Sequence, residues 1–318
     1  MAPAVICVAS GKGGVGKTTS VANISIALAG KGLEVLAWDL DGQGNLGQAF
    51  GVDMAHLGLS SYHLMSRQLD AVSRAIRPTR FKGVSLVPAH MELFAAEQEL
   101  VDSGGKDFIL RDLVQQPEAQ AFDVILFDLP PNLGFLTVNG FAASRWVLIP
   151  LQVSGFALTG LRQLAHAIRQ AQEQLNPELE LLGLVPTFVH QRTVFSRDLI
   201  GALDLIPGMR VFQPHIPYTV RVAEASLTGT PVMAASPSSP AARAYADVTD
   251  GIWQVIRSSP AHLTRAPAPA LSAPARAERV GDGIAAGAVP QAAPDADQGQ
   301  GRRLGFMARL RGTPRPGP

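Results

Sequence analysis

The feature that most constrains this chain is a glycine-rich stretch near its start, residues 11–18, which reads GKGGVGKT. It matches the pattern G-x-x-x-x-G-K-[ST], in which glycines let successive backbone N–H groups turn inward around phosphate oxygens. The stretch lies between an apolar run at residues 4–10 and a helical pattern at residues 18–30, and a helix N-terminus adds partial positive charge. The sequence therefore predicts a phosphate-binding loop, with the Lys17 ammonium at the phosphates and the Thr18 hydroxyl on a Mg²⁺ ion.

Short apolar runs alternate with helical patterns along the first 257 residues. Continuous apolar runs are typical of parallel strands that are buried on both faces. Such runs occupy residues 4–10, 34–40, 83–88, 124–128, 146–150 and 181–185. The clearest helical patterns occupy residues 18–30, 157–175 and 240–256. This alternation predicts an α/β fold, a doubly wound, mostly parallel sheet with helices on both faces, as in P-loop NTPases.

Two strand ends are expected to bring carboxylates toward the loop. Asp128 ends the run VILFD and has the form of a Walker B aspartate, which holds the Mg²⁺ shell. Asp39 and Asp41 end the second apolar run, and strand alternation points both toward the same side. We expect Asp39 to share the Mg²⁺ site with Asp128 and Thr18. Asp41, the outer residue, is the better candidate to orient an attacking water.

The single cysteine and the lack of long apolar runs exclude several classes of protein. Cys7 alone cannot form an internal disulfide, a CxxC redox pair or a multi-cysteine metal site, so we expect it in the core. No run of 18 apolar residues occurs, and no basic segment precedes the first apolar run. A membrane span and a secretory signal are therefore not expected. The sequence predicts a soluble, cytoplasmic protein.

Composition changes sharply at about Ser258. Residues 258–318 hold nine prolines, abundant alanine and glycine, and one aromatic residue. Such a segment buries too little apolar surface to offset its ordering entropy, so we predict a disordered tail after a domain at residues 1–257. The tail holds eight arginines and four acidic residues, a net charge of +4. Because the whole chain has a net charge of +1, the net charge of the domain is −3. Any basic patch on the domain must therefore be local.

Taken together, these motifs resemble the ParA/MinD family of deviant Walker ATPases, and most closely its chromosomal ParA (Soj-like) branch. The resemblance covers residues 4 to about 257. The family's KGGVGKTT, DLDPQGN, D-x-PP-S-LG and IP-R-NVRLAEAPSHGKPV are matched at residues 12–19, 39–45, 128–134 and 216–232. Three positions depart from the family, with Gly42 in place of proline, Asn132 in place of serine and Tyr218 in place of arginine.

The resemblance implies slow hydrolysis of ATP with Mg²⁺ as a second cofactor. It implies that Lys12 reaches the nucleotide of a partner subunit in an ATP-bound dimer, that Asp41 is the hydrolytic aspartate, and that Pro217 lines the adenine pocket. The residues expected to bind ATP are Gly11, Lys12, Gly13, Gly14, Val15, Gly16, Lys17, Thr18, Thr19 and Pro217.

The resemblance also implies partners. Arg192 and Arg221 match basic positions that the family uses for sequence-independent DNA contact. We therefore expect an ATP-dependent homodimer that is nucleoid-associated and binds non-specific DNA. A ParB-like adaptor protein would stimulate hydrolysis, and the system would segregate DNA or a protein assembly.

Two alternatives stay open. A MinD-like membrane-associated positioning ATPase would use residues 302–311, RRLGFMARLR, as an amphipathic anchor. Arg303 lies inside the apolar arc of that helix and Gly305 weakens it, which argues against this reading. A small-molecule ligase of the dethiobiotin or cobyrinate synthetase kind would share the glycine-rich loop, but the match at residues 216–232 argues against that class.

Overall fold

A computed structural model of the chain describes residues 2–54, 57–99, 105–155, 157–190, 193–206 and 208–259. Residues 260–318, which hold nearly all of the predicted tail, lie outside these ranges, as does Arg192. What the sequence predicts for them stays a prediction.

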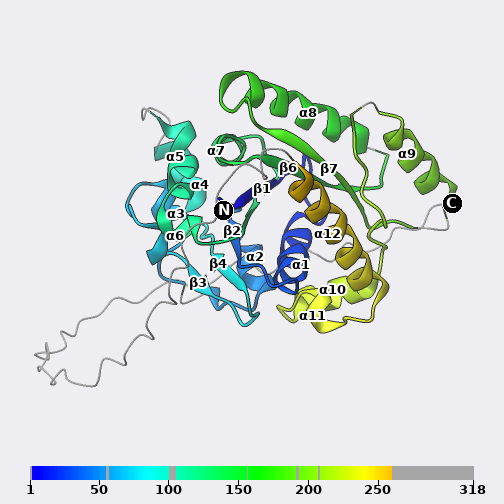
Figure 1. Cartoon of the computed structure of the whole chain (residues 1–318), viewed down its shortest axis with the longest axis horizontal. Helices are drawn as coiled ribbons and strands as arrows, with labels where there is room; N and C mark the ends of the chain where they lie inside the picture. The colour runs from blue at the N-terminus through cyan, green and yellow to red at the C-terminus, as the bar shows by residue number, and fades with distance from the viewer. Residues whose placement is uncertain are drawn as a thin grey trace, which may run out of the picture. The chain divides into compact units, whose positions relative to one another are not determined.

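Seven strands of the described residues form one sheet, in the order β3-β4-β2-β5-β1-β6-β7 (Figure 1). The strands are β1 (Ala4–Val8), β2 (Val35–Asp39), β3 (Arg77–Pro78), β4 (Val84–Val87), β5 (Val124–Asp128), β6 (Trp146–Gln152) and β7 (Glu180–Thr187). All neighbours are parallel except β3 and β4. The predicted sheet is confirmed. The sequence missed only β3, because two residues carry no periodicity.

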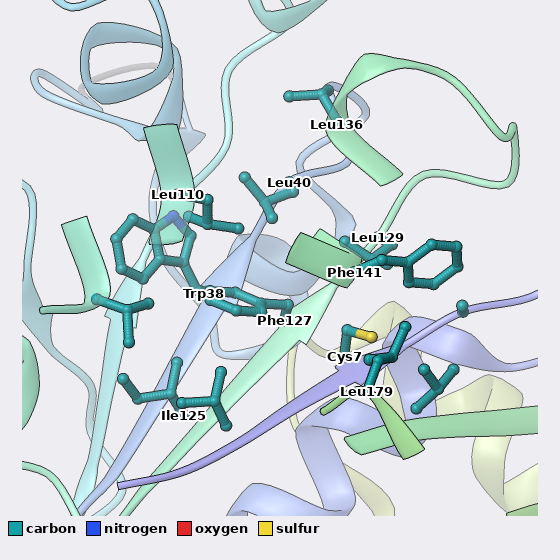
Figure 2. Packing of buried hydrophobic residues seen from close by; sticks show 14 of the residues in the cluster. Cys7, Trp38, Leu40, Leu110, Ile125, Phe127, Leu129, Leu136, Phe141 and Leu179 are labelled. Atoms are coloured by element: carbon teal, nitrogen blue, oxygen red, sulfur yellow. The ribbon is translucent and has the colours of Figure 1, made fainter. Parts of the chain in front are cut away.

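The central strands feed two hydrophobic cores, one on each face of the sheet. Cys7, Trp38 and Phe127 belong to one core, in which the Trp38 and Phe127 rings meet edge to face at 5.6 Å between centroids (Figure 2). Ile6 and Leu126 belong to the other. Because helices cover both faces, every residue of β1, β2 and β5 is buried, which explains their continuous apolar runs. Cys7 is a core residue, as expected.

Helices lie on both faces of the sheet (Figure 1). The Cys7 side receives α3 (Ser61–Met65), α4 (Leu93–Glu99), α5 (Ile109–Val114), α6 (Pro117–Gln120), α7 (Phe135–Ala143), α8 (Ala157–Gln174) and α9 (Val194–Asp204). The Ile6 side receives α1 (Lys17–Ala29), α2 (Asn45–Ala49), α10 (Val220–Leu227), α11 (Val232–Ala235) and α12 (Pro240–Ser258). Short 3₁₀ turns occur at Val72–Arg74 and Lys106–Phe108.

The three helices predicted from the sequence are α1, α8 and α12, each found within two residues of its expected bounds. Val21, Ile24 and Leu28 of α1 are fully buried on one face of that helix. Beside them, the Ser20 hydroxyl lies 3.3 Å from the Tyr245 hydroxyl and ties α1 to α12. Within the described residues, the helices are all too short or too polar to cross a bilayer.

Candidate functional site

The glycine-rich loop leaves β1 at the C-terminal end of that strand and leads into α1. Gly16 is the N-cap residue of α1, has φ 88°, and offers no side-chain acceptor to the first-turn amides. Gly14 also lies in the left-handed region, with φ 74°. A Cβ added at Gly13 or Gly14 would meet no atom within 4 Å, so this part of the loop is open. Amides without a side-chain cap at a positively polarised helix end form a site for an anion.

The loop is held in place by segments far along the chain. A Cβ on Gly11 would lie 2.7 Å from the Gly160 carbonyl oxygen of α8, so only glycine allows this close approach. The Thr187 hydroxyl at the end of β7 donates a hydrogen bond of 2.7 Å to the Val15 carbonyl. Neither Gly160 nor Thr187 was singled out from the sequence, because both contacts span more than 140 residues and leave no local signal.

Asp128 ends β5 beside the loop, in register with Val8 of β1. Its carboxylate is fully buried, and within the described residues neither oxygen has a hydrogen-bond partner of normal geometry. Burial raises the pKa of Asp128 to about 6, the nearby Lys17 ammonium and Thr18 hydroxyl oppose that rise, and the Asp41 charge adds to it. A buried anionic group next to a lysine and a threonine hydroxyl fits a divalent cation that also contacts phosphate.

Asp39 ends the neighbouring strand β2, in register with Asp128. Its Oδ1 accepts a hydrogen bond of 3.0 Å from the Asp41 amide, and its Oδ2 accepts one of 3.1 Å from the Leu46 amide. Burial, followed by the Asp128 charge, raises the pKa of Asp39 well above its usual range, while these two amides oppose the rise. Both Asp39 oxygens thus tie down the loop that follows β2, and the role of Asp39 as a Mg²⁺ ligand stays a prediction.

That loop carries Asp41, which is 7% exposed. The Asp41 carbonyl accepts a hydrogen bond of 2.9 Å from the Gly44 amide, and its Oδ1 accepts one of 3.1 Å from the Gln43 amide. Asp41 lies close enough to Asp128 for its charge to raise the pKa of Asp128. The described residues hold no group of three His, Cys, Asp or Glu side chains that could bind a metal ion unaided. A cation here would need water or phosphate oxygens as further ligands, as Mg²⁺ commonly does.

Two other predicted ligands flank the loop. Lys12 is exposed at the loop edge, where its carbonyl accepts a hydrogen bond of 2.8 Å from the Ser10 hydroxyl. Thr19 is half-buried in the first turn of α1, and its carbonyl accepts one of 2.8 Å from the Asn23 side chain. The two lysines of the loop therefore differ in burial: Lys12 is exposed, whereas Lys17 is buried.

Pro217 is brought to the same end of the sheet by the segment after β7. It pairs with Val189 in an isolated parallel bridge, and the Tyr218 amide donates a hydrogen bond of 3.1 Å to the Val189 carbonyl. One residue earlier, the Phe188 ring would lie 3.3 Å from a Cβ on Gly16. Pro217 therefore pairs with the residue that directly follows Phe188, whose ring lies beside Gly16.

The predicted DNA contacts are described only in part. Arg221 lies in α10, and its side chain is 61% exposed and forms an ion pair with Glu224 at 3.0 Å. Nearby, the exposed Tyr218 ring stacks on His190 with 4.8 Å between centroids. Arg192 lies outside the described residues.

Comparison with known proteins places these features in a family. A family model described as an AAA domain matches residues 3–181. The chromosome partitioning protein ParA of Myxococcus xanthus is 35% identical over 229 residues, which cover 72% of this chain and 80% of that protein. The sporulation initiation inhibitor protein Soj of Bacillus subtilis is 34% identical over 244 residues, which cover 77% and 96%.

A solved structure shows the same fold. Cobyrinic acid a,c-diamide synthase from Mycobacterium smegmatis, with bound ADP and magnesium, superposes with a TM-score of 0.71 at 34% identity, over 80% of this chain and 96% of that one. The matched residues 3–181 include the glycine-rich loop and the aspartates at the ends of β2 and β5. The chain belongs to the AAA-domain family of ParA/MinD-type P-loop ATPases, which includes the chromosome partitioning protein ParA and the sporulation initiation inhibitor protein Soj.

Proposed function

We propose that this protein is a partitioning ATPase that dimerises on ATP, binds DNA of any sequence and is stimulated by a ParB-like adaptor to segregate DNA or a protein assembly. One observation supports the proposed binding of nucleotide and Mg²⁺. The two carboxylate oxygens of Asp128 are buried without hydrogen-bond partners among the described residues, beside Lys17 and Thr18 at the N-terminus of α1. A buried carboxylate whose oxygens lack hydrogen-bond partners is costly unless a ligand completes the site.

The residues divide the chemistry among themselves. The amides of residues 13–18 and the Lys17 ammonium neutralise phosphate oxygens, and Thr18 and Asp128 hold the Mg²⁺ ion. Mg²⁺, when bound, draws negative charge from the transferring phosphoryl group. Asp39 fixes the turn that carries Asp41, and Asp41 orients the attacking water by accepting its hydrogen bond.

In a dimer, each subunit would contribute Lys12 to the nucleotide site of its partner. Lys12 is exposed at the loop edge, and its family counterpart is expected to act across a dimer interface. The arginine contacts to DNA then occur twice on one assembly, so that ATP controls DNA binding through avidity. Such doubling would matter for a domain with a net charge of −3, because any basic patch on it must be local. Binding of this kind would make the protein nucleoid-associated in the cytoplasm.

The second candidate is a small-molecule ligase, which the 34% identity to the diamide synthase structure favours. Amide transfer from glutamine through a cysteine nucleophile is not available to this chain. Its one cysteine, Cys7, is fully buried, and burial raises the pKa of its thiol to about 12, so it cannot supply a reactive thiolate at neutral pH.

The ATP hydrolysis rate separates these functions. We expect slow basal turnover that rises with duplex DNA and the adaptor protein together, and no effect of a cobyrinate-type carboxylic acid with ammonium. A rate increase with the carboxylic acid and ammonium, in the absence of DNA and adaptor, would establish the ligase instead. Co-sedimentation with anionic vesicles in the presence of ATP, but not with DNA, would establish the MinD-like membrane function.

A further inference from the structure

The turn that carries Asp41 has glycine at a position that suits proline. The hydrogen bond from the Gly44 amide to the Asp41 carbonyl closes a four-residue β-turn with Gly42 in second place. Neither Gly42 nor Gln43 has a positive φ, which excludes type II and the primed turns. In the remaining common turn, type I, aspartate is favoured in the first place and proline in the second. The ParA-like sequence pattern has proline there, and this chain has Gly42.

The absence of a side chain at Gly42 is explained by space and not by backbone conformation. A Cβ at this position would lie 2.9, 3.0 and 3.1 Å from Cε2, Cζ and Cδ2 of the Phe94 ring. Real Cβ atoms rarely approach other carbons so closely, so the ring occupies the place of a side chain at position 42. Gly44 differs, because its φ of 64° itself favours glycine.

Phe94 is carried by a helix that is anchored in the core. Leu93 of α4 is fully buried in the same core as Cys7 and Trp38, and Ala96 is also fully buried, whereas Phe94 is 50% exposed. Anchoring of α4 holds the backbone of Phe94 in place, with the ring against the turn at Gly42 and half of the residue exposed. A half-exposed aromatic ring over a nearly buried aspartate turn is poorly explained by core packing alone.

We propose that Phe94 is a positioning residue for Asp41. Its ring restrains the turn from outside, as a proline ring at position 42 would restrain it from within. The glycine and the phenylalanine therefore act as one unit, since any side chain at position 42 would displace the ring. The inference rests on the proposed role of Asp41 in hydrolysis and names the group that sets its position.

The test compares Phe94→Ala with the double variant Phe94→Ala/Gly42→Pro. Loss of the ring should lower kcat for ATP hydrolysis about two- to fivefold, the scale on which one proline-like restraint shifts a local equilibrium. KM for ATP should stay unchanged, because the phosphate-binding loop is untouched. Proline at position 42 should restore kcat in the double variant, since within the described residues no hydrogen bond uses the Gly42 amide. Met91→Ala, which removes a side chain that is 67% exposed in the turn before α4, is the matched control and should leave kcat unchanged.

Hydrogen exchange of the nucleotide-free protein gives an independent measurement. The amides of residues 41 and 43–46 should exchange faster in Phe94→Ala than in the wild type, and at the wild-type rate in the double variant. Unchanged exchange in Phe94→Ala, or a double variant as impaired as the single one, would overturn the proposal. If Asp41→Ala hydrolyses ATP normally, the proposed function of Asp41 fails, and the exchange rates still decide whether Phe94 restrains the turn.

Discussion

Asp39 and Asp128 lie opposite each other in register at the ends of β2 and β5, and both are fully buried. Their carboxylates differ in what they contact. Both oxygens of Asp39 accept backbone amide hydrogen bonds, whereas neither oxygen of Asp128 has a partner in the described part of the chain. Among the described residues, Asp39 is therefore the one of these two aspartates that is hydrogen-bonded to the loop after β2.

The pKa of Asp128 predicts how Mg²⁺ binding depends on pH. Burial raises that pKa from its ordinary 3.8 to about 6, and Mg²⁺ requires the ionised form. The Mg²⁺-dependent tightening of ADP binding should therefore weaken about tenfold between pH 7 and pH 5, as the ionised fraction falls through this pKa. Fluorescent-ADP titrations with and without Mg²⁺ measure it. Asp128→Asn separates this effect from titration of the phosphates, and an identical pH profile in that variant would contradict the assignment.

The stability of the ligand-free protein should also depend on the ionisation of Asp128. It should decrease as pH rises, whereas Mg²⁺ binding strengthens. A carboxyl group whose pKa is raised on folding stabilises the fold fully below its unfolded pKa and loses that contribution as pH rises through the folded value. The free energy of unfolding should thus fall between about pH 4 and pH 6. Asp39 shifts in the same direction, so the contribution of Asp128 is the part of the slope that Asp128→Asn removes.

Alanine substitutions should separate the two aspartates. Asp39→Ala leaves the buried amides of Asp41 and Leu46 without acceptors, which should cost about 1–3 kcal/mol of unfolding free energy. Asp128→Ala removes a charge that has no such donors, so at pH 7 it should cost much less or stabilise the ligand-free protein. Urea denaturation at pH 7 measures both. Equal losses in the two variants would show that the amide bonds are not what distinguishes them.

Alanine substitutions at two glycines of the loop should also differ in their effect on stability. A Cβ at Gly11 would lie 2.7 Å from the Gly160 carbonyl oxygen, a backbone atom that cannot move aside freely. Gly11→Ala should therefore lower the unfolding free energy by about 1–3 kcal/mol. Gly13→Ala is the matched control, because it has open space and no positive φ and should stay within about 0.5 kcal/mol of the wild type. Thermal unfolding without nucleotide gives both values. Equal stability of the two variants would show that the approach of Gly160 does not require glycine at position 11.

Alanine substitutions at the two lysines of the loop should impair different steps, ATP binding for Lys17 and dimerisation for Lys12. Lys17 is buried beside Asp128, so Lys17→Ala should weaken ATP binding itself. Lys12 is exposed, so Lys12→Ala should bind ATP with nearly wild-type affinity and yet remain a monomer. Light scattering after size exclusion, with ATP and Mg²⁺, reports the mass. A dimer formed by Lys12→Ala would remove the role of Lys12 across the interface.

Features coded by short stretches of sequence could be predicted, and features that depend on distant contacts could not. The glycine-rich loop, the buried strands and Asp128 each follow from residues that are adjacent in the chain. Gly160 and Phe94 could not be found, because their importance comes from close approach to Gly11 and Gly42 in the folded protein. The two hydrogen bonds of Asp39 depend on where the amides of the following turn point, which its position at a strand end does not reveal.

We propose that ATP bound at this loop switches the protein into a form that binds any DNA. The most direct measurement uses Asp41→Ala, which should bind ATP and Mg²⁺ but hydrolyse it slowly, and a fluorescent duplex of random sequence at low salt. We predict that anisotropy rises with protein concentration in ATP and stays near baseline in ADP. Equal binding in the two nucleotides, or no binding in ATP by protein that is dimeric by mass, would contradict the account.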